Sequence, residues 1–452
     1  MQQKYKQKGP PEVVRIQKLR TNYELRYGFN KKLTEYIKTL PKEHWKTRVD
    51  SFTDQDGNVK EDWVRAIREI EIGNVISFLL DNSMPFKLEN LMPDESQRLV
   101  REYKERQERI NKIVRAKVDG IDISGEDYSM FKVPPFDYQK KAIKFFEMNG
   151  GVGILGDQPG IGKSYAAFGY AIKNKLRTLV VCPSAVKTVW RDQILKFTNE
   201  KAFVFKQKTS KKNPVKNPPK DSALIHIINY ESLATYIKLQ YKHKCSGKKI
   251  NLQTKERENC NYEFIDENKA YKECPICKNK NTIKSKLNTF LLVGDKQDVY
   301  LDNEAYDLII LDECHRIKES KTNWTQVIKT AFQDTTKNKL LLSGTAIKNR
   351  PIEFFTPLNF MDKEDWNSRH DFAKRYCAAY EDTFGWDYNG ASNLEELYER
   401  ISPLYLRRLK KDVLPELPEK TFTDIIVEFD DKEEKEYRKL EKGEEGEDEK
   451  SF

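Results

Sequence analysis

The chain has 452 residues, 38% of them hydrophobic and 34% charged, so it can build several cores but carries more charge than the roughly 25% of an average globular protein. No apolar run approaches the ~18 residues of a membrane helix, and the basic start lacks the apolar stretch of a signal peptide, which argues against membrane and secreted proteins. Lysine and arginine exceed aspartate and glutamate by 81 − 71 = 10. Residues 428–452 hold twelve acidic and six basic side chains, so the rest of the chain carries a net charge of +16. This charge suits a polyanionic partner.

The first 95 residues are predicted to contain a tail and a small module. Residues 1–20 have the composition of a loose basic tail. Residues 21–95 are expected to form a small α+β module. Within it, residues 23–29 alternate like a strand, and residues 32–40 and 67–80 have the periodicity of helices.

A charged helical linker at residues 96–125 is expected to lead into a larger domain at residues 126–427. Short, nearly continuous apolar runs recur in that domain, separated by helix-like segments. These runs are VGILG (152–156), TLVVCP (178–183), ALIHIIN (223–229), DLIILD (307–312) and KLLLSG (339–344). They are typical of strands buried on both faces of a parallel sheet, so we expect a doubly wound α/β fold with functional groups at the carboxyl ends of its strands. An acidic charged tail, residues 428–452, completes the chain.

The sequence GILGDQPGIGKS at residues 153–164 has the features of a phosphate-binding loop. An apolar strand precedes a glycine-rich turn with Gly160 and Gly162, and a helix-like segment follows Lys163 and Ser164. Backbone N–H groups of such a turn and the helix N-terminus can surround phosphate oxygens. Lys163 can reach the β- and γ-phosphates, and Ser164 can hold Mg²⁺. The alternative is a chance glycine-rich turn.

An acidic pair follows a later apolar strand, in LIILDECH at residues 308–315. Asp312 would hold Mg²⁺ together with Ser164, and Glu313 would orient and deprotonate the attacking water. The alternative is a carboxylate pair that caps the next helix. The order of the motifs, with the loop lysine first and the acidic pair several strands later, favours a Mg²⁺-ATP site with Lys163, Asp312 and Glu313 as its catalytic residues.

A third motif, KLLLSGTAIKNRP at residues 339–351, places Ser343 and Thr345 after another apolar strand. These hydroxyls can hydrogen-bond the acidic motif and relay nucleotide state to a bound nucleic-acid strand. By itself this sequence is typical of an ordinary turn. Its position after the other two motifs is what favours a functional role.

An insertion at residues 241–290 holds four of the seven cysteines. A disulfide framework is not expected, because seven cysteines are few for this length and an odd number cannot all pair. Cys274 and Cys277 form a tight pair that can turn two thiolates toward one metal ion. We expect a structural Zn²⁺ held by this pair with Cys245 and Cys260, with His243 as an alternative ligand. The other interpretation is a set of free intracellular thiols in a floppy loop. In either case the cysteine count favours the reducing interior of a cell, namely the cytoplasm, the nucleoid or the cytoplasm of a host.

Six segments occur in the order found in the Swi/Snf-type ATPases of helicase superfamily two. They are GDQPGIGKS, VVCPSAVKTVW, INYESL, DECH, SGTAIKNRP and LYLRRLKKDVLPELPEK. From about residue 136 to 427 the chain resembles the first RecA-like lobe of these motors, and it is most similar to the annealing-helicase (HARP-like) branch. Residues 21–95 resemble the HARP-type module of that branch through the stretch YELRYGFNKKLTEYIKTLPKEHW. In that branch the module helps to engage branched DNA.

The resemblance implies further site residues. Gln139 matches the glutamine that reads the adenine edge, and the alternative is an exposed glutamine at the start of a helix. Residues that match positions in contact with nucleic acid or in its coupling to ATP are Pro183, Ser184, Lys187, His315, Ser343 and Thr345. Three positions depart from the family pattern: Asp157-Gln158-Pro159 replaces Asp-Glu-Met, Cys314 replaces a small residue, and Ala346 replaces proline. Asp157 also stands where a strict phosphate loop has its first glycine.

The resemblance implies a DNA-stimulated ATPase that remodels double-stranded or branched DNA by branch migration, annealing or fork processing, as in DNA repair and recombination. The family's second RecA-like lobe, with its arginine fingers, should follow the LPEK segment. We therefore expect this chain to bind ATP but hydrolyse it slowly by itself. The second lobe is expected either on a separate polypeptide or in a longer form of which this chain is a truncation. The alternative is a nucleotide-gated DNA-binding or regulatory subunit without turnover.

Overall fold

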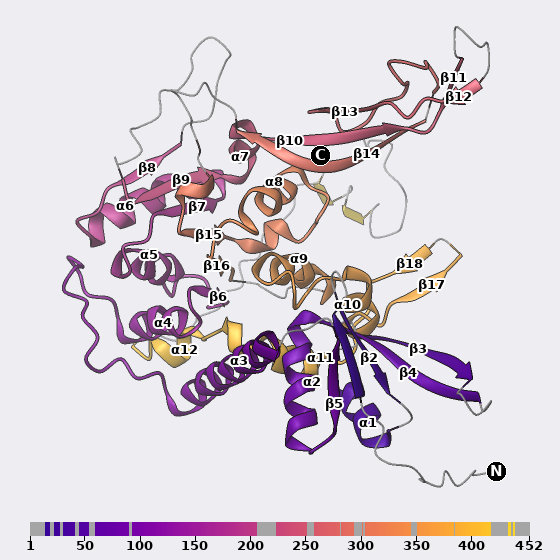
Figure 1. Ribbon diagram of the computed structural model, residues 1–452. Helices are drawn as coiled ribbons and strands as arrows, with labels where there is room; N and C mark the ends of the chain where they lie inside the picture. Colours follow the sequence, from indigo (N-terminus) through magenta and orange to yellow (C-terminus); the bar gives the residue numbers. More distant parts are fainter. Residues whose placement is uncertain are drawn as a thin grey trace. The chain divides into compact units, whose positions relative to one another are not determined.

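The computed structural model describes most of the chain, and Figure 1 draws its secondary structure. The described residues are 14–18, 22–27, 30–40, 45–53, 59–89, 93–205, 223–250, 257–280, 282–292, 301, 303–344, 350–383, 385–416, 433–434 and 437–438. By its internal contacts the chain divides into two units, Met1–Leu409 and Lys410–Phe452. The second unit has a short helix, α12 (Lys410–Val413), and most of the predicted acidic tail lies outside the described residues.

The N-terminal module is a five-stranded sheet with two helices. Its elements are β1 (Val14–Lys18), β2 (Asn22–Tyr27), α1 (Lys31–Thr39), β3 (Trp45–Thr53), β4 (Val59–Arg68), α2 (Glu69–Asp81) and β5 (Phe86–Glu89). The strand order is β3-β4-β2-β1-β5, and β1 is parallel to β5. Two predictions were wrong here. Residues 14–18 belong to a strand rather than to a loose tail, and residues 67–68 end β4 rather than begin the second helix.

A single long helix, α3 (Pro93–Asp119), links this module to the larger domain. Proline at its first position and acidic residues in its first turn favour a helix start there. Leu99 packs into the apolar core of the module, whereas Ile113 packs into a core of the larger domain. A Cβ atom on Gly73 of α2 would lie 2.3 Å from the carbonyl oxygen of Leu99, so this close approach of α2 and α3 requires glycine.

The larger domain is built on a seven-stranded, all-parallel sheet. Its strands are β6 (Val152–Leu155), β7 (Thr178–Cys182), β8 (Ala202–Val204), β9 (Ile225–Asn229), β15 (Leu308–Asp312), β16 (Asn338–Leu342) and β19 (Tyr405–Leu406), in the order β19-β6-β16-β15-β7-β9-β8. All five predicted strands are present, and β8 and β19 are additional. The predicted doubly wound α/β fold is confirmed.

Successive residues of a buried strand point to opposite faces of the sheet, so both faces of this sheet are apolar and both are covered by helices. Leu308 and Ile310 of β15 pack in one core with α4 (Asp137–Met148), α5 (Lys163–Lys173) and α6 (Lys187–Phe197). Ile309 and Leu311 pack in the other core with α7 (Tyr230–Tyr236), α8 (Asn323–Phe332) and α9 (Ile352–Met361). The carboxyl ends of β6, β16 and β15, which are neighbours in the sheet, therefore carry the three predicted nucleotide motifs.

An arm leaves the domain between α7 and β15, and it is drawn at the upper right of Figure 1. Two long antiparallel strands, β10 (Ile237–Cys245) and β14 (Ile283–Leu292), form it together with β13 (Glu263–Asp266), in the order β13-β10-β14. A short hairpin, β11 (Lys248–Ile250) and β12 (Arg257–Asn259), lies beyond β10. In its described residues, the predicted insertion at residues 241–290 thus contains a folded ribbon.

After residue 350 the described part of the domain is mostly helical. Its elements include α10 (Arg369–Tyr376), β17 (Tyr380–Asp382), β18 (Gly385–Asp387), α11 (Leu394–Ile401) and a 3₁₀ turn at Ser402–Leu404. Earlier in the domain, further 3₁₀ turns lie at Ser184–Val186, Asn303–Ala305 and Cys314–Ile317. Among the described residues, no helix combines the length and apolar character needed to cross a membrane.

Candidate nucleotide and metal sites

The predicted phosphate loop connects β6 to α5. Gly160 and Gly162 have φ values of 88° and 91°, in the left-handed region that favours glycine, and Gly162 is the residue before the first turn of α5. The Lys163 ammonium donates a hydrogen bond of 2.9 Å to the carbonyl oxygen of Asp157, so the lysine side chain folds back over the loop. Ser164 follows Lys163 in the first turn of α5. The backbone N–H groups at the N-terminus of a helix favour anions.

Asp157, which departs from the usual loop pattern, has a structural partner that the sequence did not reveal. Its side chain is fully buried, and it accepts hydrogen bonds from the backbone N–H and the guanidinium of Arg408, at 2.9 Å from the N–H and 3.1 Å from Nε. The N–H of Gly156 also donates to the carbonyl oxygen of Leu406 at 2.7 Å. The segment at residues 405–408 is thereby fixed against the phosphate loop, and Asp157 acts as its anchor.

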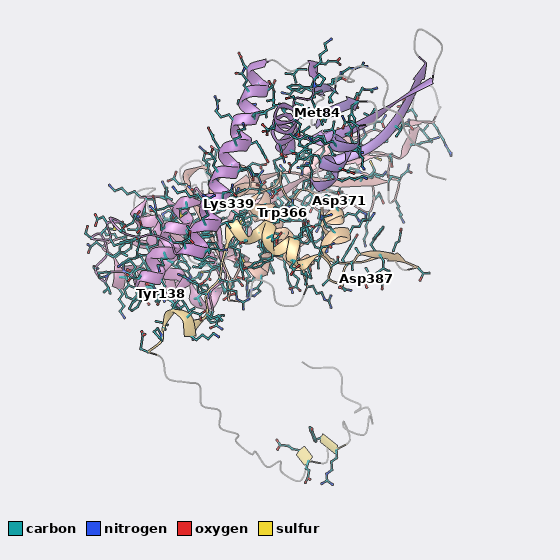
Figure 2. All side chains as sticks on the ribbon, turned by 90° about the horizontal axis from the view of Figure 1, so that it is seen from below. Met84, Tyr138, Lys339, Trp366, Asp371 and Asp387 are labelled. Atoms are coloured by element: carbon teal, nitrogen blue, oxygen red, sulfur yellow. The ribbon has the colours of Figure 1, made fainter. Side chains whose placement is uncertain are left out.

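Gln139 is buried at the start of α4 rather than exposed. Its Oε1 accepts a hydrogen bond of 3.0 Å from the N–H of Phe136, and its Nε2 lies 3.4 Å from the carbonyl oxygen of Ile161 in the phosphate loop. The preceding residue, Tyr138, is labelled in Figure 2, and its ring lies 5.6 Å from the Arg408 guanidinium carbon. Gln139 therefore touches the loop, and its role at the adenine edge stays a prediction.

Asp312 ends β15 with both carboxylate oxygens occupied by protein donors. Trp190 of α6 donates from Nε1 to Oδ2 at 2.8 Å, and the N–H of Glu313 donates to Oδ1 at 3.0 Å. Burial raises the pKa of Asp312, whereas the Trp190 hydrogen bond and the nearby Lys163 ammonium lower it. Trp190 fixes this carboxylate, and only its position at the end of the VVCPSAVKTVW segment pointed to it.

Glu313 has a left-handed backbone, with φ 51° and ψ 57°, which is uncommon for a residue with a Cβ. Such strain is typical of functional sites because the surrounding structure must hold it. The Glu313 carboxylate is about one-third exposed and lies 3.2 Å from Nδ1 of His315. The structure therefore brings Glu313 and His315 together at the accessible edge of the sheet, beyond Asp312.

The SGT motif meets the phosphate loop directly. Ser343 is fully buried, and its N–H donates to the carbonyl oxygen of Leu155 at 3.1 Å. A Cβ atom on Gly344 would lie 2.9 Å from Cγ of Pro159 and 3.6 Å from Nζ of Lys163. Thr345, the other predicted member of this motif, lies outside the described residues.

The residues assigned to nucleic-acid contact after β7 lie at the same edge of the sheet. Pro183 and the exposed Ser184 follow the carboxyl end of β7. Lys187 begins α6, and its ammonium donates to the carbonyl oxygen of Phe205 at 3.3 Å. Pro183 and Ser184 are therefore accessible, whereas Lys187 is held by the protein itself.

Four thiols meet near the tip of the arm, as predicted. The Sγ atoms of Cys245, Cys260, Cys274 and Cys277 all lie within 4.8 Å of one another, with 3.6 Å between Cys245 and Cys277 and 3.8 Å between Cys260 and Cys274. Four sulfurs at 2.3 Å from a tetrahedral zinc are about 3.8 Å apart, so the spacing fits such an ion. Burial opposes ionisation of Cys245, but hydrogen bonds from Thr282 and from the N–H of Gly247 lower its pKa below the ordinary value.

His243, the alternative ligand, does not join these thiols. Its fully buried ring contacts Ser285 Oγ through Nδ1 at 2.7 Å and Asp266 Oδ1 through Nε2 at 3.0 Å. The ring also stacks on Phe264, with centroids 4.7 Å apart. Both ring nitrogens are committed to these hydrogen bonds, so the structure favours the set of four cysteines.

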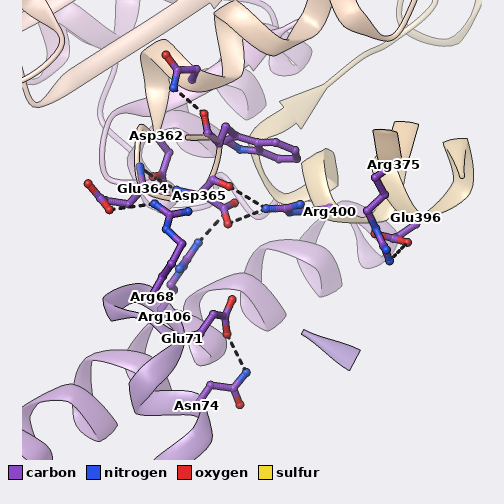
Figure 3. Close-up of polar contacts among 12 residues, drawn as sticks. Arg68, Glu71, Asn74, Arg106, Asp362, Glu364, Asp365, Arg375, Glu396 and Arg400 are labelled. Carbon is purple, nitrogen blue, oxygen red and sulfur yellow. Dashed lines mark hydrogen bonds and ion pairs between the residues drawn. The ribbon is translucent and has the colours of Figure 1, made fainter. Parts of the chain in front are cut away.

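The helix α3 and the module contact the larger domain through a charged cluster, shown in Figure 3. Asp365 accepts a hydrogen bond of 3.0 Å from Arg400 of α11 and lies 3.7 Å from Arg106 of α3. The neighbouring Glu364 pairs with Arg68 of β4 at 3.2 Å. Further along α3, the Lys117 ammonium donates to the carbonyl oxygens of Ser402 at 2.8 Å and Tyr405 at 2.9 Å.

A glycine-rich loop after β6, together with a half-buried carboxylate and a strained glutamate after β15, lies at one edge of the parallel sheet and defines a lobe of the P-loop nucleotide-binding class. The chain belongs to the family of SNF2-related domains, whose model matches residues 138–450.

Three relatives illustrate this membership. The chain is 40% identical over 135 residues, 30% of its length, to the SWI/SNF-related matrix-associated actin-dependent regulator of chromatin subfamily A-like protein 1 of Drosophila melanogaster. It is 28% identical over 65% of its length to the Caenorhabditis elegans homolog of that protein. It is 27% identical over 64% of its length to the DNA annealing helicase and endonuclease ZRANB3 of Bos taurus. The chain spans 18%, 34% and 22% of these relatives, respectively.

Proposed function

We propose that this chain provides the ATP-binding lobe of a DNA-dependent ATPase that remodels double-stranded or branched DNA. The observation that carries the proposal is the convergence of the phosphate loop, Asp312 and Glu313 at the carboxyl ends of β6 and β15, with the SGT motif between them. Family membership agrees with it, and one relative is named as an annealing helicase. Annealing, branch migration and fork processing are the activities that we expect.

In this proposal each residue has a distinct task. Lys163 leaves the Asp157 carbonyl and neutralises the β- and γ-phosphates, while Gly160 and Gly162 let backbone N–H groups face them. Ser164 and Asp312 hold Mg²⁺, which neutralises phosphate charge when it is bound. Glu313, next to His315, orients the attacking water and accepts its proton. Gln139 binds the adenine edge.

DNA would lie along the edge of the sheet that carries Pro183, Ser184 and His315. Ser343 and Thr345 would couple its position to the state of the nucleotide. Full turnover would also need an arginine at the leaving phosphate, which we propose comes from a second RecA-like lobe and which a separate polypeptide can supply. The four-cysteine cluster would hold one structural Zn²⁺ and so stabilise the arm.

The test is ATP binding and hydrolysis by the wild-type chain, Lys163→Ala and Glu313→Gln, each with and without duplex DNA and with and without a separately produced second lobe. We expect Lys163→Ala to weaken ATP binding at least tenfold, and Glu313→Gln to retain binding but lose DNA-stimulated turnover by at least a hundredfold. A wild-type chain that binds ATP and DNA but never turns over, even with the second lobe, would instead indicate a nucleotide-gated DNA-binding subunit. Turnover that survives both substitutions would refute the site.

A further inference from the structure

Four lysines lie side by side on one face of the arm. The strands β10 and β14 pair with Lys242 directly opposite Lys286 and Lys244 directly opposite Lys284. Side chains at directly opposite positions of an antiparallel pair project from the same face, and like charges at such positions destabilise the pair. All four side chains are exposed. Two such pairs in succession leave the lysine ammonium groups repelling one another, and a bound anion would reduce this repulsion.

The arm itself offsets only part of this charge. Glu263 of β13 contacts Lys242 at 2.8 Å and Lys244 at 3.0 Å, and these two lysines lower the pKa of its carboxyl group. In the described part of the chain, no carboxylate forms an ion pair with Lys284 or Lys286. One glutamate therefore serves two of the four lysines, and the β14 half of the face remains available.

The opposite face of the ribbon holds these lysines in a fixed arrangement. His243 and Ser285, which alternate with the lysines along the two strands, are hydrogen-bonded to each other there, and Phe264 and Tyr271 pack on the His243 ring. The pairing runs without interruption from Tyr241 to Cys245, where the four-thiol cluster begins. Lysines two residues apart on a strand lie about 6.8 Å apart, so the face is an ordered array rather than a mobile tail.

The whole arm has the same sign of charge. Its described residues, 237–250, 257–280 and 282–292, contain twelve lysines and arginines and five aspartates and glutamates, a net charge of 12 − 5 = +7. A fixed row of cations on a strongly positive element suits a regular polyanion. Duplex DNA presents one negative charge for about every 1.7 Å of its axis, and flexible ammonium groups can follow that spacing.

We propose that Lys242, Lys244, Lys284 and Lys286 form a second DNA-binding surface, the lysine face, which contacts the phosphate backbone outside the ATPase site. The contact is independent of base sequence because it engages phosphates alone. It is also independent of ATP, because no residue of the lysine face belongs to the nucleotide motifs. The inference goes beyond the proposed motor function, since it assigns a binding role to the inserted arm.

The experiment measures binding of a fluorescent mixed-sequence DNA duplex to the full chain without nucleotide, between 50 and 200 mM salt. The test variant is Lys284→Ala with Lys286→Ala, which leaves the Glu263 ion pairs intact. A matched control is Lys201→Ala with Lys337→Ala, two exposed lysines that precede β8 and β16 at the amino-terminal edge of the sheet. A second variant, Lys284→Arg with Lys286→Arg, preserves the charge.

We expect the alanine variant to lose about two phosphate contacts. The slope of log affinity against log salt should then fall by about 1.8, with at least about tenfold weaker binding at the low-salt end. The arginine variant and the control should bind like the wild type. Equal affinity and slope for the alanine variant and the control would overturn the proposal, provided that circular dichroism and metal content show an intact arm.

Failure of this proposal is distinguishable from failure of the motor function. The alanine variant should keep wild-type ATP affinity and wild-type turnover at saturating DNA. If the wild-type chain did not bind ATP, the motor site would be refuted, and the proposal of a salt-dependent DNA contact would be unaffected.

Discussion

Asp312 depends on a residue that is far away in sequence. In the proposed site its carboxylate must be ionised and correctly oriented to hold Mg²⁺, yet burial raises its pKa and favours the neutral form. The indole N–H of Trp190 counteracts burial by donating to Oδ2. A hydrogen bond to a charged group contributes about 1.5–3 kcal/mol, so this contact has a measurable share in keeping the site organised.

Trp190→Phe should therefore lower DNA-stimulated turnover about tenfold, since it removes this donor but keeps an aromatic ring in the core. ATP affinity should change less than threefold, because the phosphate loop is untouched. The matched control is Trp366→Phe, which removes a buried indole whose N–H has no hydrogen-bond partner among the residues that the structure describes. Equal losses of turnover in the two variants would mean that Trp190 contributes only packing.

The residues proposed to bind the nucleotide could be selected from the sequence because each stands in a local motif with its own chemistry. Lys163 follows a glycine-rich turn, and Asp312 and Glu313 end an apolar run, so their positions required no knowledge of distant contacts. Trp190 and Arg408 were missed as site residues because their partners are 122 and 251 residues away. No periodicity or spacing encodes such pairs.

At the level of elements, the buried parallel strands were the most predictable. All residues of β7 and β9 are buried, and a run of consecutive apolar residues is a direct consequence of that environment. β8 and β19 were missed because three and two residues are too short to form a pattern. The ribbon of β10 and β14 was missed because lysines on its exposed face resemble a solvated insertion. The same lysines became interpretable only when the register placed them opposite each other.

The metal cluster gives a prediction for the arm as an element. The purified chain should contain about one Zn²⁺, and Cys274→Ser with Cys277→Ser should lose it, as measured by elemental analysis. Hydrogen exchange in β10 and β14 should then accelerate, because the proposed ion would hold together the cysteines that lie beyond both strands. Cys182→Ser with Cys377→Ser, two buried cysteines away from the arm, is the matched control and should retain the metal. Full retention of zinc in the first variant would rule out these ligands.

For the molecule as a whole, α3 joins the cores of the module and the larger domain, and the charged cluster around Asp365 fixes it from the side. Asp365 and Arg400 are both largely buried, with 15% and 12% of their side chains exposed. Removing one partner of a buried pair leaves the other charge poorly solvated. This arrangement was not predictable, because it joins residues from three separate segments of the chain.

Asp365→Ala should accordingly lower the free energy of unfolding by roughly 2 kcal/mol in urea titrations and increase hydrogen exchange in α3. Arg400 retains the backbone carbonyl of residue 365 and the Tyr376 hydroxyl, so the loss should not be larger. Asp334→Ala disrupts the exposed pair with Lys363 and should cost less than about 0.5 kcal/mol. An unchanged exchange rate in α3 would show that the cluster does not hold this helix.

The segment at residues 402–408 connects helix α3 to the phosphate loop. Lys117 of α3 holds the carbonyl oxygens of Ser402 and Tyr405, and a few residues later Leu406 and Arg408 hold Gly156 and Asp157. Any ligand of the N-terminal module that displaced α3 would therefore change the affinity of the loop for nucleotide. Thermodynamic reciprocity then requires the nucleotide to change the affinity of the module for that ligand by the same factor.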